Sequence, residues 1–296
     1  MTAVQPTIRP EPGQWPSLLR AATAYRPVHA ELFRRELGLP TDKPVVMTGH
    51  QAQFWHPGIL TKYLAADALA TRTGAASAWI VVDQDTNPPG IIRLPVRRAA
   101  PDGRALRVET WPIDPGAARE HGDIPTARQP ALKPGPAPTL DAGETWAAPG
   151  IADGLAAIRA SLSAHAAAPS AAAQLAAAVA DLLAPLMRSS AHTVLSLTIS
   201  RTSLFREMIE RMAADPGACI RAYNAAVAAH PRERIQPLGP DELPLWAIGP
   251  EPGANRRRAM VADLRTLPFD HLAPRALMMT GLLRCAACDL FIHGTG

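Results

Sequence analysis

Short apolar segments that end in polar residues alternate with a helical pattern in the N-terminal part of this chain. The first segment covers residues 45–47 and the second covers residues 78–82. Between them, apolar residues follow helical spacing from Ile59, and Gly74 is placed to end that helix. Strand, helix and strand within roughly forty residues are typical of a right-handed parallel unit. Because ligands of open parallel sheets bind at the carboxyl ends of the strands, we expect a site after residues 47 and 82.

Similar patterns predict further elements on both sides of this unit. Residues 15–38 are expected to be helical with a break at Pro27, and residues 151–188 helical with a break at Pro169. Strands are expected at residues 91–96, 193–199, 243–248, 256–264 and 289–293, and helices at residues 204–213, 218–229 and 276–284. Residues 100–150 are rich in Pro and Gly, and we expect an irregular excursion there.

Together these elements predict an α/β fold, with a Rossmann-like, mostly parallel sheet and an inserted helical segment. Residues 1–100 would form the first part of the core, 101–190 the Pro-rich excursion with the inserted helices, and 191–296 the second part. The last strand runs into Gly294-Thr295-Gly296, and a strand followed by Gly-x-Gly normally leads to a helix. We therefore expect an incomplete second part and a fragment; the alternative is a C-terminus that packs into the sheet.

Composition narrows the class of protein. With 296 residues, of which 47% are hydrophobic and 19% charged, the chain can bury a sizeable core. The net charge of +4 is dispersed, and the one run of arginines, at 256–258, is interpreted as a solvated turn, so nucleic acid is not expected as a partner. No apolar window approaches the roughly 18 residues of a membrane span, and the N-terminus lacks the apolar core of a signal peptide. Three cysteines without framework spacing agree with a cytoplasmic protein.

The segment at residues 48–58, between the first strand and its helix, is the first candidate site. Its backbone N–H groups and the helix N-terminus could hold an anion such as a phosphate or a carboxylate. His50 or His56 would add a charged or proton-transferring contact, because histidine titrates near neutral pH. Lys62, in the first helical turn, opposes the helix dipole, and a bound anion would offset this. The alternative is an ordinary loop with locally satisfied histidines and a solvated lysine.

Asp83 and Asp85 follow the second strand. Residues two apart on a strand share a face, so both carboxylates are expected to point toward one ligand, such as a sugar hydroxyl or an amine. The alternative is a turn that leads into Asn87-Pro88.

Five further residues carry weaker signals. His293 lies at the carboxyl end of the last strand, and Asn224, in a predicted helix, could reach a nucleotide or serve as a packing or capping residue. Cys285-x-x-Cys288 is a single pair, so it is interpreted as two small buried residues, like Cys219, and no metal site is predicted.

Three patches of the chain resemble the bacillithiol-biosynthesis cysteine-adding enzyme family. In that family a strand leads into Thr-Gly-Gln-Gln, a Gly-bearing loop and a helix with a Lys near its start, and the next strand commonly ends in Glu-Asp-His-Asp. The matching residues are Thr48-Gly49-His50-Gln51, Gly58, Lys62 and Val82-Asp83-Gln84-Asp85. A late Arg-Pro-Leu segment and a strand ending in Gly-Gly-Pro-Gly-Glu are matched by Pro274-Arg275-Ala276-Leu277 and Ile292-His293-Gly294-Thr295-Gly296.

The resemblance implies a Rossmann-like core similar to that of class I nucleotidyltransferases, with inserted connecting helices, and a ligase that adds cysteine to an amino-sugar conjugate. The resemblance is compatible with a nucleotide, ATP or ADP, as a cofactor, and with a homodimer. The candidate catalytic residues are then His50, Asp83 and Asp85, and the candidate substrate- or nucleotide-binding residues are Thr48, Gly49, Gln51, His56, Gly58, Lys62, Asn224, His293 and Gly294.

The departures from the family pattern leave two alternatives open. His50 replaces the first Gln of the family, Val82 its Glu and Gln84 its His. If those family residues transfer protons, this chain cannot do so in the same way. The alternatives are a non-catalytic Rossmann-like paralogue that binds a nucleotide or a sugar, and a nucleotidyltransferase-like enzyme.

Overall fold

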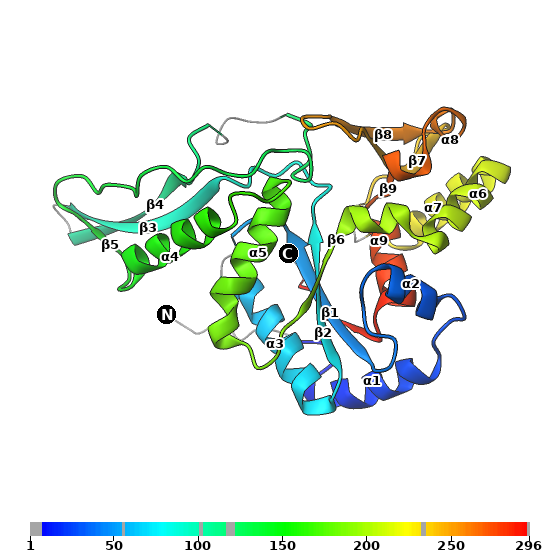
Figure 1. Cartoon of the computed structure of the whole chain (residues 1–296), viewed down its shortest axis with the longest axis horizontal. Helices are drawn as coiled ribbons and strands as arrows, with labels where there is room; N and C mark the ends of the chain where they lie inside the picture. The colour runs from blue at the N-terminus through cyan, green and yellow to red at the C-terminus, as the bar shows by residue number, and fades with distance from the viewer. Residues whose placement is uncertain (1–7, 55–56, 101–102, 117–121, 232–234, 295–296) are drawn as a thin grey trace.

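The computed structural model describes residues 8–54, 57–100, 103–116, 122–231 and 235–294. At its centre lies a four-stranded, all-parallel sheet with the strand order β10-β1-β2-β6 (Figure 1). These strands are β1 (Val45–Gln51), β2 (Ala76–Val82), β6 (His192–Leu195) and β10 (Leu290–Phe291). The predicted α/β fold with a Rossmann-like parallel sheet is therefore confirmed.

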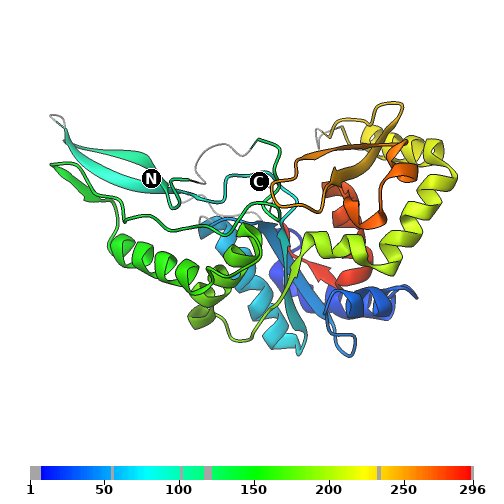
Figure 2. The same ribbon diagram turned by 45° about the horizontal axis from the view of Figure 1, so that its top comes forward.

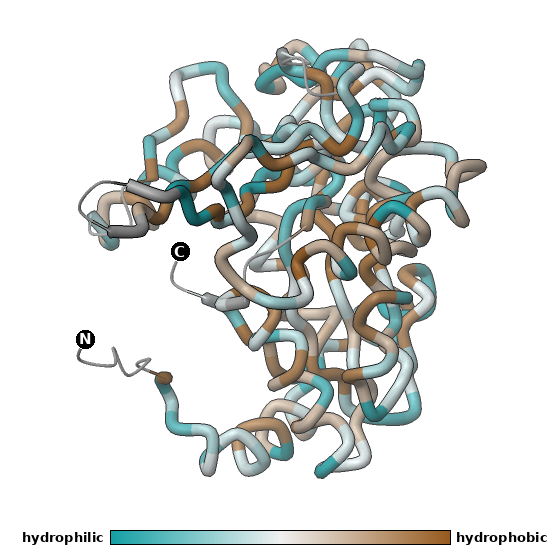
Figure 3. Tube along the Cα trace, turned by 90° about the vertical axis from the view of Figure 1, so that its left-hand side faces the viewer, coloured by the Kyte–Doolittle hydropathy of each residue, from teal (hydrophilic) through white to brown (hydrophobic). Residues whose placement is uncertain are grey.

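Helices cover both faces of this sheet. On one face, Val46 and Trp79 pack against α1 (Trp15–Ala24), α3 (Pro57–Thr73) and α5 (Ala171–Leu183). On the other face, Met47 and Ile80 pack in the largest core, with residues of α2 (Ala30–Glu36), α6 (Ser203–Ala214) and α9 (Ala276–Leu282). Hydrophobic stretches gather within this layered body (Figure 3). Burial on both faces explains why β1 and β2 are almost continuously apolar in the sequence.

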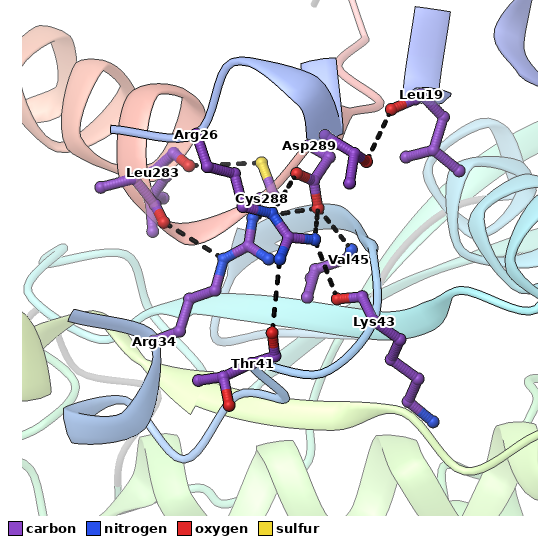
Figure 4. Close-up of polar contacts among 11 residues, drawn as sticks. Leu19, Arg26, Arg34, Thr41, Lys43, Val45, Leu283, Cys288 and Asp289 are labelled. Carbon is purple, nitrogen blue, oxygen red and sulfur yellow. Dashed lines mark hydrogen bonds and ion pairs between the residues drawn. The ribbon is translucent and has the colours of Figure 1, made fainter. Parts of the chain in front are cut away.

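The short strand β10 is held in place by a buried ion-pair network at its start (Figure 4). The Asp289 carboxylate accepts hydrogen bonds from Arg26 Nε at 2.9 Å, Arg34 Nη2 at 3.0 Å and the backbone N–H of Val45 at 2.8 Å. Burial opposes the charge of Asp289, but these donors outweigh it and hold the pKa of Asp289 below its ordinary value. The network fixes β10 beside β1, 244 positions earlier in the chain.

A second sheet occupies part of the segment that was expected to be irregular. β3 (Ile91–Ala100) and β4 (Gly103–Pro112) pair antiparallel over their whole length, and β5 (Glu144–Trp146) pairs with the other edge of β3. The hairpin projects away from the parallel sheet (Figures 1 and 2). The prediction was therefore wrong for residues 103–112 and 144–146. For residues 122–143 the structure has turns and extended chain, as expected. The inserted helices α4 (Ile151–Ala164) and α5 are separated at Pro169, also as expected.

The third sheet, with the order β8-β7-β9, contains β7 (Glu242–Ile248), β8 (Arg256–Met260) and β9 (Leu272–Pro274). It confirms the predicted hairpin, but the strand expected at 256–264 ends at Met260, and residues 263–264 belong to a short helix. The other α-helices are α7 (Pro216–Ala229) and α8 (Asp263–Thr266). The chain also forms a π-helix at Leu283–Ala287 and 3-10 helices at Pro12–Gln14, Ala184–Leu186, Ser196–Arg201 and Phe269–His271. The strand expected at 193–199 is shorter, because the chain turns into the 3-10 helix at Ser196.

Candidate functional site

The strand order places a topological switch point between β1 and β10. From β1 the chain moves to β2 and then β6 on one side, and it returns to the opposite side of β1 with β10. In open parallel sheets, ligands bind outside the carboxyl ends of the two strands that flank such a point. The residues at this end are Thr48, Gly49 and His50 on β1, and His293 and Gly294 after β10. Several of the predicted site residues therefore come together here.

Lys62, on α3, reaches this switch point. Its Nζ donates a hydrogen bond to the carbonyl oxygen of Gly49 at 3.2 Å. Its stem lies beside Gly294, whose Cβ, if it had one, would be 3.4 Å from Cδ of Lys62. Burial lowers the pKa of the Lys62 ammonium, and within the described parts of the chain no carboxylate forms an ion pair with it. A half-buried cation with one carbonyl contact can accept an anion.

Thr48 and Gly49 have packing roles at this end of the sheet. Thr48 is fully buried, and its Oγ1 donates to the carbonyl oxygen of Ile292 at 2.9 Å, which ties β1 to the end of β10. A Cβ at Gly49 would lie 2.1 Å from Cγ2 of Ile80 and 2.2 Å from its carbonyl oxygen. Only glycine allows β1 and β2 to approach this closely, so the structure gives Gly49 a packing role.

His50 and Gln51 belong to β1 and not to a loop. Their Cα partners on β2 are Val81 and Val82, and both side chains are half-buried at the end of the sheet. Gly58 lies in the first turn of α3, where its carbonyl accepts a hydrogen bond from Thr61 Oγ1 at 2.8 Å. The helix also begins two positions earlier than expected. His56 lies outside the described residues.

Asp83 and Asp85 do not share one face, because β2 ends at Val82 and residues 83–84 form a turn. The carboxylate of Asp83 accepts from Ser196 Oγ at 2.7 Å and from the backbone N–H of Leu197 at 2.9 Å. Asp85 instead forms an ion pair with Arg256 Nη1 at 2.9 Å. The prediction that both carboxylates point toward one ligand was wrong, since the period of two applies only within a strand.

Burial raises the pKa of Asp83 to about 6, even though its hydrogen bonds from Ser196 and Leu197 favour the ionised form. Such a pKa would suit a general acid or base, but a catalytic carboxyl must come within hydrogen-bond distance of a substrate. Asp83 is 2% exposed and holds the start of the 3-10 helix after β6. Its geometry is that of a buried structural acid.

The three consecutive arginines are not a solvated turn. Each forms an ion pair: Arg256 with Asp85, Arg257 with Asp263 at 2.6 Å and Arg258 with Glu242 at 3.1 Å. These pairs lie on and around the third sheet. The pair of Arg256 with Asp85 could not be inferred from the sequence, because the two residues are 171 positions apart.

Arg256 also connects the third sheet to the end of β2. Its guanidinium lies 4.1 Å from the ring centroid of Trp246, and it donates to the carbonyl oxygen of Gln84 at 2.7 Å. Gln84, at the position of the family's His, is buried and donates through Nε2 to the carbonyl oxygen of Pro274 at 2.7 Å. Gln84 therefore joins β2 to β9 and does not face a ligand.

Asn224 and the cysteines lie outside the switch point. Asn224 forms two hydrogen bonds with the backbone of Leu238, accepting at 2.7 Å and donating at 3.0 Å, so both groups of its amide are occupied by the protein. Cys288 is buried and Cys219 half-buried, as interpreted, but Cys285 is exposed. No group of three or more His, Cys, Asp or Glu side chains within the described ranges is arranged to hold a metal ion.

Comparison with protein-family models found no match, and a search of curated proteins found none either. The resemblance to the cysteine-adding family therefore stays a prediction. None of the helices in the described part of the chain combines the length and the apolar character needed to cross a membrane.

Proposed function

We propose that this chain binds a small anionic molecule in the crevice between the carboxyl ends of β1 and β10, with Lys62 as its cationic contact. The observation that carries the proposal is the half-buried Lys62 ammonium, whose hydrogen bond to Gly49 O leaves its charge without a carboxylate among the described residues. An ionised ligand group would offset the cost of burying this charge.

A nucleotide or a free carboxylate fits this chemistry. Either class carries an anionic group that a lysine binds as a point charge. The start of α3 is close along the chain to Lys62, and the N-terminus of a helix favours anions. ATP or ADP and the carboxylate of cysteine are therefore the ligands to examine first.

The activity that we propose is that of a cysteine-adding ligase acting on an amino-sugar conjugate. This assignment rests on the resemblance of residues 48–62, 82–85, 274–277 and 292–296 to that family, together with the Rossmann-like sheet. In such a reaction the carboxyl group of cysteine forms an amide with the amine of the sugar and water is lost. The crevice would hold the two reacting groups together, which reduces the entropic part of the barrier.

A non-catalytic paralogue that binds a nucleotide or a sugar is the second candidate. Two observations favour it: Asp83 and Asp85 are both engaged by the protein, and Gln84 takes the place of the family's His. Both candidates share the same crevice, so binding is tested before turnover.

The experiment is a melting-temperature screen with ATP, ADP, cysteine, glucosamine and pyrophosphate, followed by titration calorimetry with each ligand that stabilises the protein. Lys62→Met keeps most of the buried stem and removes the charge. A charge-assisted hydrogen bond contributes about 1.5–3 kcal/mol, so this variant should bind roughly 10- to 150-fold more weakly. Lys133→Met is the matched control, because Lys133 is exposed and distant from β1 in the sequence.

Two results would refute the proposal. The first is the absence of a stabilising ligand among the five compounds for the unmodified chain. The second is a ligand whose affinity is the same for Lys62→Met and Lys133→Met. If binding depends on Lys62, incubation with ATP, cysteine and an amino-sugar conjugate separates the two candidates, because only the ligase yields a product with a new amide bond.

A further inference from the structure

The edge strand β4 carries an apolar surface that nothing in the described chain covers. Leu106 and Val108 are 66% and 63% exposed. Within the described residues, no backbone group of residues 105–110 is hydrogen-bonded outside the pairing with β3. An open strand edge with exposed apolar side chains is a template for pairing with another strand.

The order of charges along β4 determines which strand fits. Arg107 lies directly before Val108, and Glu109 directly after it. Within one chain Arg107 forms ion pairs with Glu109 at 2.6 Å and Glu144 at 2.7 Å, and both Arg107 and Glu109 keep part of their side chains exposed. An antiparallel copy of β4 centred on Val108 would place each Arg107 opposite Glu109 of the second copy.

We propose that β4 pairs antiparallel with β4 of a second copy of this chain, about a twofold axis at Val108. The two three-stranded sheets would then join into one six-stranded sheet. Leu106 and Val108 of both copies would form a continuous apolar stripe on its outer face, since residues two apart lie on the same side of a strand. Opposite charges directly across a strand pair stabilise it.

Neighbouring registers are disfavoured by the same charges. Side chains that pair across antiparallel strands must lie on the same face, so one strand can slide along the other only in steps of two residues. A shift of two residues in one direction places Arg107 opposite Arg107 of the second copy. The same shift in the other direction places Glu109 opposite Glu109 of the second copy. Like charges directly opposite each other are destabilising.

Packing of the outer faces against each other is also disfavoured. Arg97 pairs with Leu106 and Arg93 with Thr110, so both exposed arginines lie on the face that carries Leu106 and Val108. A face-to-face dimer would bring these like charges together around the apolar stripe. Edge-to-edge pairing leaves the arginines in solvent.

The test measures self-association of the full chain by sedimentation equilibrium. The contact is one short strand, smaller than a standard interface, so we expect a dimer with a Kd on the order of micromolar. Arg107→Glu and Glu109→Arg each create two like-charge contacts, and each variant alone should dimerise at least ~10-fold more weakly. An equimolar mixture should recover the dimer, because the carboxylate introduced in one variant then lies opposite the guanidinium introduced in the other.

A second measurement does not depend on the charges. Val108→Cys, made in a Cys285→Ser background to remove the exposed native thiol, should form an intermolecular disulfide on mild oxidation. Arg93→Cys in the same background is the control, because it is exposed on the same face but belongs to β3. Circular dichroism and melting temperature verify that each variant is folded.

Recovery of the dimer in the mixture and selective cross-linking at residue 108 would support the pairing. A chain that stays monomeric to hundreds of micromolar would overturn it. A dimer that neither charge change weakens, or that cross-links equally at residues 93 and 108, would also overturn it, since the contact would then lie elsewhere. Arg107→Glu also places two carboxylates together, because Arg107 pairs with Glu144 in the unmodified chain. If this variant does not fold, Glu109→Arg and the two cysteine variants still decide the outcome.

Discussion

Replacing Gly49 with Ala tests whether β1 and β2 must approach closely at the end of the sheet where the candidate site lies. The added Cβ would lie 2.1 Å from Cγ2 of Ile80 and 2.2 Å from its carbonyl oxygen. Non-bonded carbon atoms rest about 3.5–4.0 Å apart, so the methyl group would be more than ~1 Å too close to each neighbour. The side chain of Ile80 can rotate, but its carbonyl is fixed in the seven-residue register between the strands.

The magnitude follows from what has to move. Overpacking that side chains can absorb costs about 1–3 kcal/mol. Here backbone must shift as well, so we expect a loss of at least ~3 kcal/mol. A change of 1 kcal/mol moves the melting temperature of a domain of ~150–250 residues by about 2–4 °C, which predicts a decrease of at least ~6 °C.

Gly154→Ala is the matched control for the same chemical change. Gly154 is exposed on α4, and a Cβ there would meet no atom within 4 Å. Alanine is favoured over glycine in a helix by about 1 kcal/mol, so this variant should melt ~2–4 °C higher. Scanning calorimetry of both variants measures the two shifts. If Gly49→Ala melts within ~2 °C of the unmodified chain, the two strands can separate there and the packing role is wrong.

Three further substitutions test individual contacts. The pKa of Asp83 is raised from 3.8 to about 6, so the contribution of Asp83 to the free energy of unfolding is complete below pH 3.8 and is lost as the pH rises through about 6. Asp83→Asn should remove this decrease with pH, which urea titrations of both proteins at several pH values would measure. Asp289→Asn weakens the buried contacts of Arg26 and Arg34 and should lower the free energy of unfolding by about 3–5 kcal/mol, whereas the exposed Asp270→Asn should change it by less than ~0.5 kcal/mol in the same urea titration. Asn224→Ala should lower the free energy of unfolding by about 1–3 kcal/mol, because its hydrogen bonds to Leu238 are lost. Calorimetry should show unchanged ligand affinity; weaker binding by this variant would make Asn224 a binding residue after all.

The parallel sheet was predictable because burial on both faces leaves a strong local pattern. β1 and β2 are apolar along most of their length, and Gly74, with a φ of +68°, ends the helix between them. β4 was missed although Leu106 and Val108 alternate with Arg107 and Glu109. This alternation is only four residues long and lies in a range, 100–150, in which Pro and Gly are frequent, so the local strand signal is weak.

The partners of the candidate site residues could not be predicted, because each is distant in the sequence. Asp83 contacts Ser196, 113 positions later, and Gln84 contacts Pro274, 190 positions later. Local periodicity assigned the two carboxylates to one face, but the turn after Val82 separated their partners. The sequence indicated the carboxyl ends of the strands after residues 47 and 82, whereas the strand order of the structure, which the sequence did not predict, places the switch point between β1 and β10, where Lys62 and Gly294 meet.

The distribution of charge around the parallel sheet bears on what the crevice can do. The acidic groups after β2 are neutralised or enclosed by the protein: Asp83 by Ser196 and the backbone of Leu197, and Asp85 by Arg256. At the switch point, Lys62 has only a carbonyl contact among the described residues. A strand end that leaves a cation available is suited to holding an anion. Asp83 and Asp85, both engaged by the protein, are poorly placed to remove a proton from it. Any proton transfer here would therefore depend on groups other than these two carboxylates, and the described side chains at this end of the sheet that can act as bases are His50 and His293.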